Sequence, residues 1–362
     1  MKLSLVVLNY NYGHFVRQAI KSALAVDWPD KEVIVVDDGS TDHSRSIIDE
    51  FRARVKIVFQ HNGGQSSACN AGFDRCSGDV VIFLDSDDAL FPSVANIVTE
   101  VWHDPVSKVQ YSLIIVDRDL RPLGLCWPRY AAHPTPEGIR EIQRKTGHYL
   151  HSPTSGNAWA RSFLQKVFPL PVRAGDPTGY RSGHNGDYRV PSMDGYLSQL
   201  APYFGNVICI RETEPQGLYR LHGSNYYVWN DGTSSSLEKY SYRVVELMES
   251  ARHVNETLDR LNVPYERINC ELNEYLMRLR LICERWYRNY PLKRSVGNTL
   301  LKYWRAISVG KDTKRMTKAK WFIWSVLVTA GPWRVGWWAI RAREQRSVFA
   351  NAMRVAAGRI AD

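Results

Sequence analysis

Short apolar runs alternate with amphipathic segments along residues 1–120 of the chain. The runs are rich in β-branched residues, and the segments between them carry apolar residues at helical spacing. This alternation is typical of parallel strands joined by crossover helices, so we predict an α/β fold with a mostly parallel sheet. The expected strands are Leu3–Leu8, Glu32–Val36, Val55–Phe59 and Val80–Leu84, and the expected helices are His14–Ala25, Asp42–Phe51 and Ser66–Cys76, with Asp42 and Ser66 as N-caps.

Polar clusters follow three of the expected strands. They are Asn9-Tyr10-Asn11, Asp37-Asp38-Gly39-Ser40 and Asp85-Ser86-Asp87-Asp88. In open α/β sheets, ligands bind at the edge formed by the carboxyl ends of the strands. The sequence therefore predicts that the three clusters meet in one ligand site.

The third cluster indicates a divalent cation. Asp85, Asp87 and Asp88 follow a buried strand, where carboxylates incur desolvation and mutual repulsion unless a positive charge lies among them. Oxygen ligands suit Mg²⁺ or Mn²⁺, whose open positions substrate phosphates fill. A solvated turn that caps the next helix is the alternative. The second cluster is equally ambiguous, because Asp-Gly followed by Ser-Thr suits a turn and a helix cap, whereas Asp38 could instead accept from a base or ribose.

Two common nucleotide-binding classes are disfavoured by missing motifs. No Gly-x-Gly-x-x-Gly follows the first strand, and no Gly-x-x-x-x-Gly-Lys-Ser/Thr occurs in the chain. This argues against a dinucleotide-binding dehydrogenase and a Walker-type nucleotidase. The segment Asn62-Gly63-Gly64-Gln65 is either a tight loop whose amides approach a ligand or a plain turn.

Composition separates the last fifth of the chain from the rest. The net charge is +10, and residues 291–362 alone hold 15 basic and 3 acidic residues together with six of the twelve tryptophans. The six cysteines are scattered without a Cys-x-x-Cys pair, which indicates a reducing compartment. The first apolar run ends at Leu8, too early for a signal peptide, so we expect a cytoplasmic location.

The C-terminal third has helical periodicity. Helices are expected over Leu237–Leu261 and Tyr265–Tyr290, packed on each other or on the first domain, and a homo-oligomer through them remains open. Further on, basic residues precede the uncharged run Trp321–Ala330, and Gly331-Pro332 interrupts the pattern. A spanning helix needs about 20 apolar residues, so we expect this part to lie in a membrane interface, with tryptophans at headgroup depth and basic residues on anionic lipid.

The basic segment has two possible roles. It is either a membrane-associating segment or a tail helix folded onto the protein with its tryptophans inside. Nucleic acid is not an expected partner, because no nucleic-acid-binding module accompanies the charge.

Four motifs in order resemble the family 2 glycosyltransferases over about residues 1–225. They are Val-Leu-Asn-Tyr-Asn, Val-Val-Asp-Asp-Gly-Ser-Thr-Asp, Asn-Gly-Gly-Gln-Ser-Ser-Ala-Cys-Asn-Ala-Gly and Phe-Leu-Asp-Ser-Asp-Asp. The resemblance implies a GT-A fold, a nucleotide-diphosphate-sugar donor, a divalent cation and inversion of the anomeric centre. We accordingly predict a GT-A catalytic domain at 1–230, a helical extension at 231–310 and a basic, Trp-rich membrane-associating segment at 311–362.

The resemblance also implies roles for individual residues of the donor site. Asp38 matches the carboxylate that reads the nucleobase, and Asp87 is the first choice for direct metal contact. His222 either completes the metal shell or is structural. The implied donor-binding residues are Leu8, Asn9, Tyr10, Asp38, Asn70, Asp85 and Arg220, and the implied ligands of Mn²⁺ or Mg²⁺ are Asp87, Asp88 and His222.

On the acceptor side the resemblance implies a catalytic base. An inverting transfer needs a carboxylate to take the proton of the acceptor hydroxyl, and Asp194 matches that residue. Asp187 is the competing candidate, and a helix-capping role for Asp194 is the structural alternative. Asn157 and Trp159 fall on the acceptor-side loop, where Trp159 either stacks on a sugar or packs in the core.

The leading hypothesis is an inverting glycosyltransferase on the inner face of the plasma membrane. Its donor is a nucleotide-diphosphate sugar, most commonly UDP-linked in the family, and its acceptor is a glycan or lipid-linked molecule of cell-surface polysaccharide or glycolipid synthesis. A sugar-nucleotide nucleotidyltransferase would also use paired aspartates and Mg²⁺ but normally carries a Gly-rich basic loop after the first strand. A non-catalytic membrane scaffold with a transferase fold is the third hypothesis.

Overall fold

The chain divides into two compact units in a computed structural model, which describes residues 1–103, 105–130, 132–172, 192–222, 235–268, 270–292, 295–309 and 315–344. The first unit comprises 1–140, 150–222 and 256–265, and the second comprises 141–149, 223–255 and 266–362. The break between residues 222 and 223 lies near the expected boundary at residue 230. The expected separation of 231–310 from 311–362 stays a prediction: residues 256–265 belong to the first unit, and the rest of both ranges belongs to the second.

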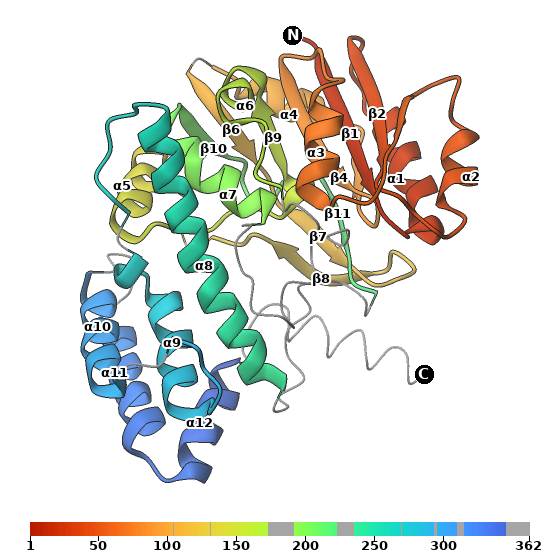
Figure 1. Ribbon diagram of the computed structural model, residues 1–362. Helices are drawn as coiled ribbons and strands as arrows, with labels where there is room; N and C mark the ends of the chain where they lie inside the picture. Colours follow the sequence, from red (N-terminus) through yellow and green to blue (C-terminus); the bar gives the residue numbers. More distant parts are fainter. Residues whose placement is uncertain are drawn as a thin grey trace. The chain divides into compact units, whose positions relative to one another are not determined.

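A seven-stranded sheet forms the centre of the first unit (Figure 1). β1 pairs in parallel with β2 and β4, and β2 pairs in parallel with β3, which confirms the four predicted strands to within a residue or two at most ends. β9 runs antiparallel between β4 and β6. The strand order is β10 (Asn206–Cys209), β6 (Val106–Gln110), β9 (Asn157–Ala160), β4 (Val80–Asp85), β1 (Leu3–Asn9), β2 (Lys31–Asp37) and β3 (Lys56–Phe59).

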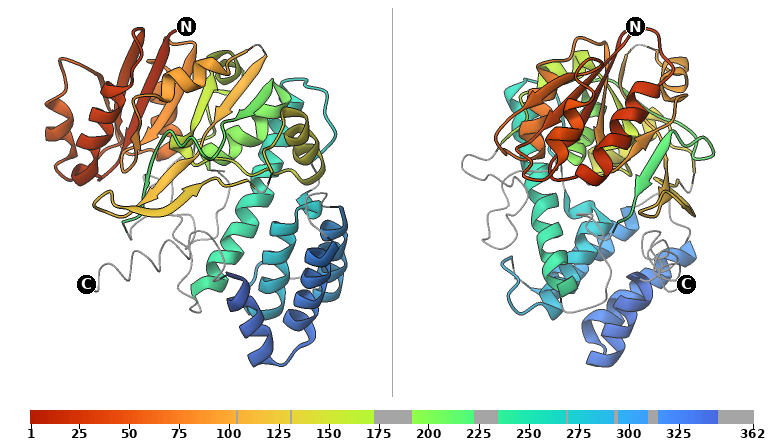
Figure 2. Two further views of the ribbon diagram at one scale, coloured as in Figure 1. Left: turned by 180° about the vertical axis from the view of Figure 1, so that it is seen from behind. Right: turned by 90° about the vertical axis from the view of Figure 1, so that its right-hand side faces the viewer.

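Helices cover both faces of this sheet because its strands are apolar on both sides. On one face of the sheet, Leu5 and Val7 of β1 share a hydrophobic cluster with Val16 and Ile20 of α1 (Gly13–Ala25). Figure 2 shows the sheet and its helices from behind and from the side. On the other face, α3 (Gln65–Phe73) approaches so closely that a Cβ at Gly72 would meet Val6. The remaining helices of this unit are α2 (Ser44–Asp49), α4 (Val94–Glu100), α6 (Arg161–Val167), α7 (Met193–Leu200), the first turn of α5 (Pro136–Thr146), and the 3-10 turns η1 (Thr154–Gly156) and η3 (Ala201–Tyr203).

The two predicted N-caps are corrected. His43 occupies the cap position of α2, and Asp42 instead accepts from the backbone N–H groups of Ser44 and Gly13, both at 2.9 Å. Ser66 lies inside α3, because Gly64 takes the cap position with φ +83°. Asp42 therefore fastens the starts of two helices together.

A second, smaller sheet begins directly after the third polar cluster. It has the order β5 (Ala89–Leu90), β11 (Gly217–Arg220), β7 (Leu113–Val116) and β8 (Pro122–Trp127). β11 is antiparallel to β5 and parallel to β7. This pairing brings Arg220 beside Asp88, although 132 residues separate them in the sequence.

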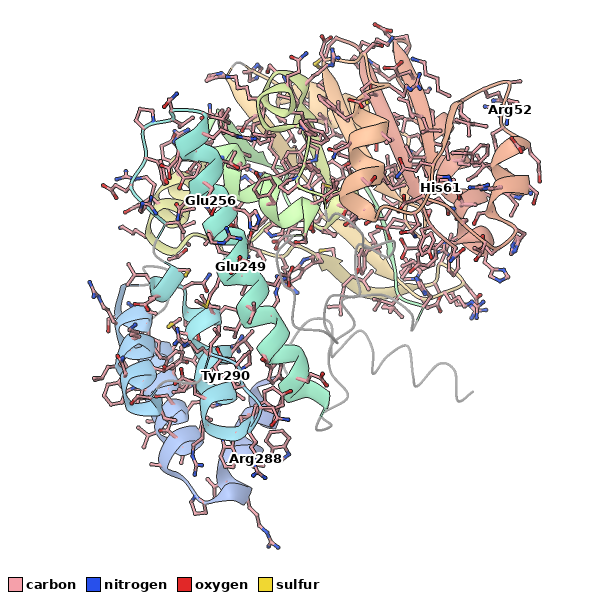
Figure 3. The ribbon with its side chains drawn as sticks, viewed as in Figure 1. Arg52, His61, Glu249, Glu256, Arg288 and Tyr290 are labelled. Carbon is pink, nitrogen blue, oxygen red and sulfur yellow. The ribbon has the colours of Figure 1, made fainter. Side chains whose placement is uncertain are left out.

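The second unit is helical, as predicted. It contains most of α8 (Ser235–Arg260), the 3-10 turn η4 (Cys270–Leu272), α9 (Glu274–Trp286), α10 (Val296–Val309), α11 (Arg315–Ala330) and α12 (Trp333–Glu344). The predicted continuous helix Tyr265–Tyr290 is wrong, because the Asn273 side chain accepts from the Leu276 N–H and starts α9 there. Tyr290 is buried in the bundle and Arg288 is exposed (Figure 3). Among the described residues, no helix combines the length and apolar character needed to cross a membrane.

Candidate functional site

The carboxyl ends of β4, β1 and β2 bring the three polar clusters to one edge of the sheet. These strands are neighbours and parallel, and their register places Asn9 beside Asp37 and Leu8 beside Asp85. The predicted convergence is confirmed. All of the side chains described below belong to the first unit.

The turn after β2 satisfies its carboxylates with protein donors. Asp37 is fully buried and accepts from Asn9 Nδ2 at 2.8 Å, Ser40 N at 3.0 Å and Arg45 Nε at 3.2 Å. These bonds connect β1, β2 and α2. Asp37 therefore has a structural role at this edge.

Asp38 holds the loop after β3. Its Oδ1 accepts from Gln60 Nε2 at 2.5 Å and Gly63 N at 2.9 Å, and its Oδ2 accepts from Gly64 N at 2.8 Å. Burial raises the pKa of Asp38, although these hydrogen bonds act in the opposite direction. The amides of Gly63 and Gly64 thus serve Asp38, and the predicted contact of Asp38 with a nucleobase would have to share these oxygens.

The segment predicted to flank a base presents one exposed side chain. Leu8 and Asn9 are buried, whereas Tyr10 is 39% exposed. Phe59, at the end of β3, is 37% exposed and lies under the Arg45 guanidinium at 5.3 Å. Tyr10 is the only member of the predicted trio positioned to meet a ligand with its side chain.

The turn after β4 leaves its carboxylates under mutual repulsion. Burial, followed by the charges of Asp87 and Asp194, raises the pKa of Asp85 to about 8. Burial and the charges of Asp87 and Asp85 also raise the pKa of Asp88 well above its usual range. A divalent cation at this turn would remove the repulsion, so the chemistry of the donor set fits Mg²⁺ or Mn²⁺.

Asp87 and His222 are the two groups best placed to hold such a cation. His222 Nε2 lies 3.1 Å from Asp87 Oδ2, and the rings of Tyr12 and Phe15 pack against the imidazole with centroids 5.4 and 4.9 Å away. The Asp87 side chain is 15% exposed. Within the described ranges, no group of three or more His, Cys, Asp and Glu residues is arranged around a metal position. A cation held by one or two protein groups takes its other ligands from water and substrate phosphates.

Asp88, a predicted metal ligand, also fixes the turn through hydrogen bonds within the protein. It is 2% exposed, its Oδ2 accepts from Ser155 Oγ at 2.7 Å, and its Oδ1 accepts from the Arg220 N–H at 3.1 Å. Both oxygens therefore face protein donors.

The hydrogen bonds of Arg220 are also made within the protein. Its guanidinium donates to the carbonyl oxygens of Asp87 and Arg118 and to Gln18 Oε1, and its Cζ lies 4.7 Å from the Phe15 ring centroid. With only 3% of the residue exposed, the predicted phosphate contact does not fit. Arg220 instead holds the backbone of the Asp87 turn in place through the hydrogen bond to the Asp87 carbonyl.

Asp194 lies in the first turn of α7, and its charge reaches the β4 turn. It contributes to the raised pKa of Asp85, so the two carboxylates are within electrostatic range. One turn further along α7, Ser198 accepts from the fully buried Lys108 Nζ at 2.7 Å. The competing base, Asp187, lies outside the described residues.

Three other predicted contacts are corrected by burial and hydrogen bonding. Asn70 exchanges two hydrogen bonds with the backbone of Leu170 (3.0 and 2.7 Å), so both the nitrogen and the oxygen of its side-chain amide have partners within the protein. Asn157 is fully buried and donates to the carbonyl of Pro153 at 2.6 Å, so it shapes the acceptor-side loop from within. Trp159 is also fully buried, which supports core packing and excludes stacking on a sugar.

Several residues of this edge were missed from the sequence. Ser155 accepts from the Asp85 N–H at 3.1 Å and donates to Asp88, while Gln60 donates to Asp38. Burial and the charge of Asp87 raise the pKa of Tyr12, which places its ring beside the acidic turn. Ser155 lies 67 residues from Asp88, and no local pattern connects the two.

Comparisons with known proteins identify the family. The model of the family described as "Glycosyl transferase family 2" matches residues 4–168. An uncharacterized glycosyltransferase of Nostoc sp. is 32% identical over 267 residues, covering 72% of this chain and 77% of that protein. The uncharacterized glycosyltransferase YibD of Escherichia coli is 26% identical over 270 residues, covering 73% and 72%.

Solved structures agree at the level of the fold. Residues 1–349 of Staphylococcus aureus TarS, in complex with UDP-GlcNAc, superpose with a TM-score of 0.51 at 16% identity, covering 98% of this chain and 88% of that one. The fold is of the GT-A type. Together with the family match and the Nostoc relative, this shows that the chain belongs to glycosyltransferase family 2.

Proposed function

We propose that this protein transfers a sugar from a nucleoside diphosphate to an acceptor hydroxyl with inversion, using Asp194 as the base and Asp87 to hold a divalent cation. The observation that carries the proposal is the electrostatic proximity of Asp194, in the first turn of α7, to the acidic turn after β4, where the Asp194 charge helps to raise the pKa of Asp85. In this proposal the Asp194 carboxylate accepts the proton, and the carboxylates of the β4 turn suit a cation that binds a diphosphate.

The chain supplies the positioning for such a reaction. Ser155 and Arg220 fix the β4 turn, and His222 Nε2 lies 3.1 Å from Asp87 Oδ2 of the same turn. When bound there, Mn²⁺ or Mg²⁺ would neutralise the departing diphosphate. Asp194 would take the proton of the acceptor hydroxyl as that oxygen attacks the anomeric carbon from the side opposite the diphosphate.

The donor and acceptor classes complete the proposal. We infer a UDP-linked donor and a glycan or lipid-linked acceptor of cell-surface polysaccharide or glycolipid synthesis. A lipid-borne acceptor suits an enzyme at the cytoplasmic face of the membrane, and the basic second unit is consistent with that place.

The test is release of nucleoside diphosphate from a panel of UDP- and GDP-linked sugars with Mn²⁺, water taking the place of the acceptor. The wild-type protein should release it from at least one donor. Asp194→Asn should lower the rate roughly a thousandfold while nucleotide still raises the melting temperature, because a general base contributes about 10²–10⁴-fold. Asp119→Asn is the matched control, since that side chain is 68% exposed, and it should leave the rate unchanged.

Each alternative gives a different result in this experiment. Release of pyrophosphate in a reaction with nucleoside triphosphate would identify a nucleotidyltransferase. Absence of stabilisation by any nucleotide, in folded protein with Mn²⁺, would support the non-catalytic scaffold. A rate in Asp194→Asn equal to the wild-type rate would remove Asp194 as the base.

A further inference from the structure

The outward face of α11 is apolar. Ala319, Ile323, Val326 and Ala330 are all exposed, and their spacing of four, three and four residues puts them on one stripe of the helix. Ile323 is 63% exposed and Val326 is 45% exposed. An exposed helix face normally carries polar residues. The exposed apolar face of α11 therefore indicates an interaction site.

The opposite face of α11 already has its partners inside the second unit. Trp324 and Val328 are buried, Trp324 Nε1 donates to the Ala339 carbonyl of α12 at 2.9 Å, and Trp304 Nε1 of α10 donates to Ser325 Oγ at 2.9 Å. The prediction that the tryptophans lie together at headgroup depth is therefore wrong for Trp324, which belongs to the core. Trp338 of α12, by contrast, has 65% of its surface exposed.

The sequence segment that contains this face carries charge of one sign. Between residues 313 and 343 the sequence contains no acidic residue and seven basic ones, at positions 314, 315, 318, 320, 334, 341 and 343. Lys320 and Arg334 are exposed, and Lys318 is half-buried. An apolar stripe with a basic border is the chemistry of a helix that lies in the interface of an anionic bilayer.

We propose that the outer apolar face of α11, defined by Ala319, Ile323, Val326 and Ala330, docks parallel to the surface of an anionic lipid bilayer, with the neighbouring lysines on the headgroups. This deepens the membrane part of the proposed function but does not depend on the transfer reaction. Lying on the bilayer is favoured over crossing it, because α11 has 16 residues and a span needs about 20.

A second copy of the chain is a less suitable occupant. Two such faces brought together would oppose their basic borders, and like charges across an interface disfavour association. The bilayer instead offers an apolar layer beneath an anionic surface, which matches both properties of the face.

The test is flotation of the full-length protein with vesicles of phosphatidylcholine alone or phosphatidylcholine mixed with phosphatidylglycerol. The wild-type protein should bind the anionic vesicles at least tenfold more tightly than the neutral ones, and added salt should weaken that preference. Val326→Asp should lower binding to the anionic vesicles about tenfold. Val172→Asp is the matched control, because Val172 is a valine with 50% exposure in the first unit, and it should bind like the wild-type protein.

A second variant tests the electrostatic half of the proposal. The pair Lys318→Gln and Lys320→Gln should lower binding to anionic vesicles at least tenfold and leave binding to neutral vesicles unchanged. Equal binding of Val326→Asp and the wild-type protein, no binding of the wild-type protein to anionic vesicles, or self-association that Val326→Asp abolishes would each overturn the proposal. Nucleotide binding in solution should be the same in all four proteins, so a failed donor assay and a failed docking assay are distinguishable.

Discussion

The turns after β2 and β4 have similar acidic sequences but differ in how strongly their carboxylates repel one another. After β2, Asp37 and Asp38 receive hydrogen bonds from six protein donors, on Asn9, Ser40, Arg45, Gln60, Gly63 and Gly64. After β4, burial and mutual repulsion raise the pKa values of Asp85 and Asp88. The carboxylates of the first turn are met by protein donors, whereas at the second turn the repulsion among Asp85, Asp87 and Asp88 persists even beside the Arg220 guanidinium.

This difference shows which acidic cluster is structural and which is functional. Fully hydrogen-bonded carboxylates stabilise a fold, whereas carboxylates that raise one another's pKa at the end of a buried strand mark a site for a cation. Both turns lie at the edge where ligands bind in open α/β sheets, so position alone does not separate them. Identical substitutions in the two turns should therefore have different consequences.

The largest expected effect is on activity, in Asp87→Asn. Loss of the carboxylate should reduce Mn²⁺-dependent release of nucleoside diphosphate by roughly a thousandfold, the scale of losing a key electrostatic contact in catalysis. The melting temperature without metal should stay the same or rise, because the substitution removes one repelling charge. A clear fall in melting temperature would show that Asp87 is structural, as Asp37 is.

The same substitution at Asp37 should act on stability. In the wild-type protein the buried Asp37 carboxylate accepts hydrogen bonds from the N–H groups of Ser40 and Arg45. Asp37→Asn can place an amide NH₂ group, itself a donor, against these donors. We expect a loss of about 2 kcal/mol of unfolding free energy, because a buried donor left without an acceptor costs about 1–3 kcal/mol. Urea denaturation measures the loss, and an unchanged midpoint would contradict the structural role.

The pH dependence of stability should reveal the repulsion at the β4 turn. In metal-free protein, the folded state keeps the Asp85 carboxyl protonated up to a pKa of about 8, whereas the ordinary value is 3.8. The unfolded chain then binds fewer protons between these values, so stability should fall as pH rises from about 4 to 8, by at most about 1.4 kcal/mol per pH unit.

Two comparisons assign that slope to the β4 turn. Asp85→Asn should flatten it, and so should saturating Mn²⁺. Thermal melting in EDTA over this pH range provides the measurement. Stability that rises with pH over the same interval, after subtraction of the Asp85→Asn profile, would contradict the raised pKa.

The smallest effect is expected at Ser155. Ser155→Ala removes the acceptor of the Asp85 N–H and a donor to Asp88, which should cost about 1 kcal/mol. The substitution should also weaken the apparent affinity for Mn²⁺ in the release assay, because the turn is less firmly positioned. Unchanged metal affinity would limit Ser155 to a role in stability.

The sequence predicted the fold wherever a local pattern determined it. Apolar runs of β-branched residues located β1 to β4, and polar residues at their ends located the site edge. The antiparallel insertion of β9 was not predicted, because Asn157–Ala160 is a four-residue run whose partners lie 50 to 80 residues away. The break before α9 was missed because Asn273 was not identified as an N-cap.

The roles of individual polar residues were predicted less well. Arg220, Asn70 and Asp88 are polar residues in conspicuous motifs, yet the side chain of each forms hydrogen bonds with other parts of the protein. Residue type and spacing do not determine which way such a side chain faces, since its partners come from distant segments such as Ser155 and Leu170. Asp87 and Tyr10 retain exposed surface at the site edge.

The most direct test of the contrast between the two turns is calorimetric titration of UDP and GDP into the wild-type protein and Asp87→Asn, with and without Mn²⁺. We predict that one nucleotide binds the wild-type protein at least tenfold more tightly with Mn²⁺, and that Asp87→Asn loses this dependence while keeping its melting temperature. Equal Mn²⁺ dependence in both proteins would contradict the assignment of the β4 turn as the cation site.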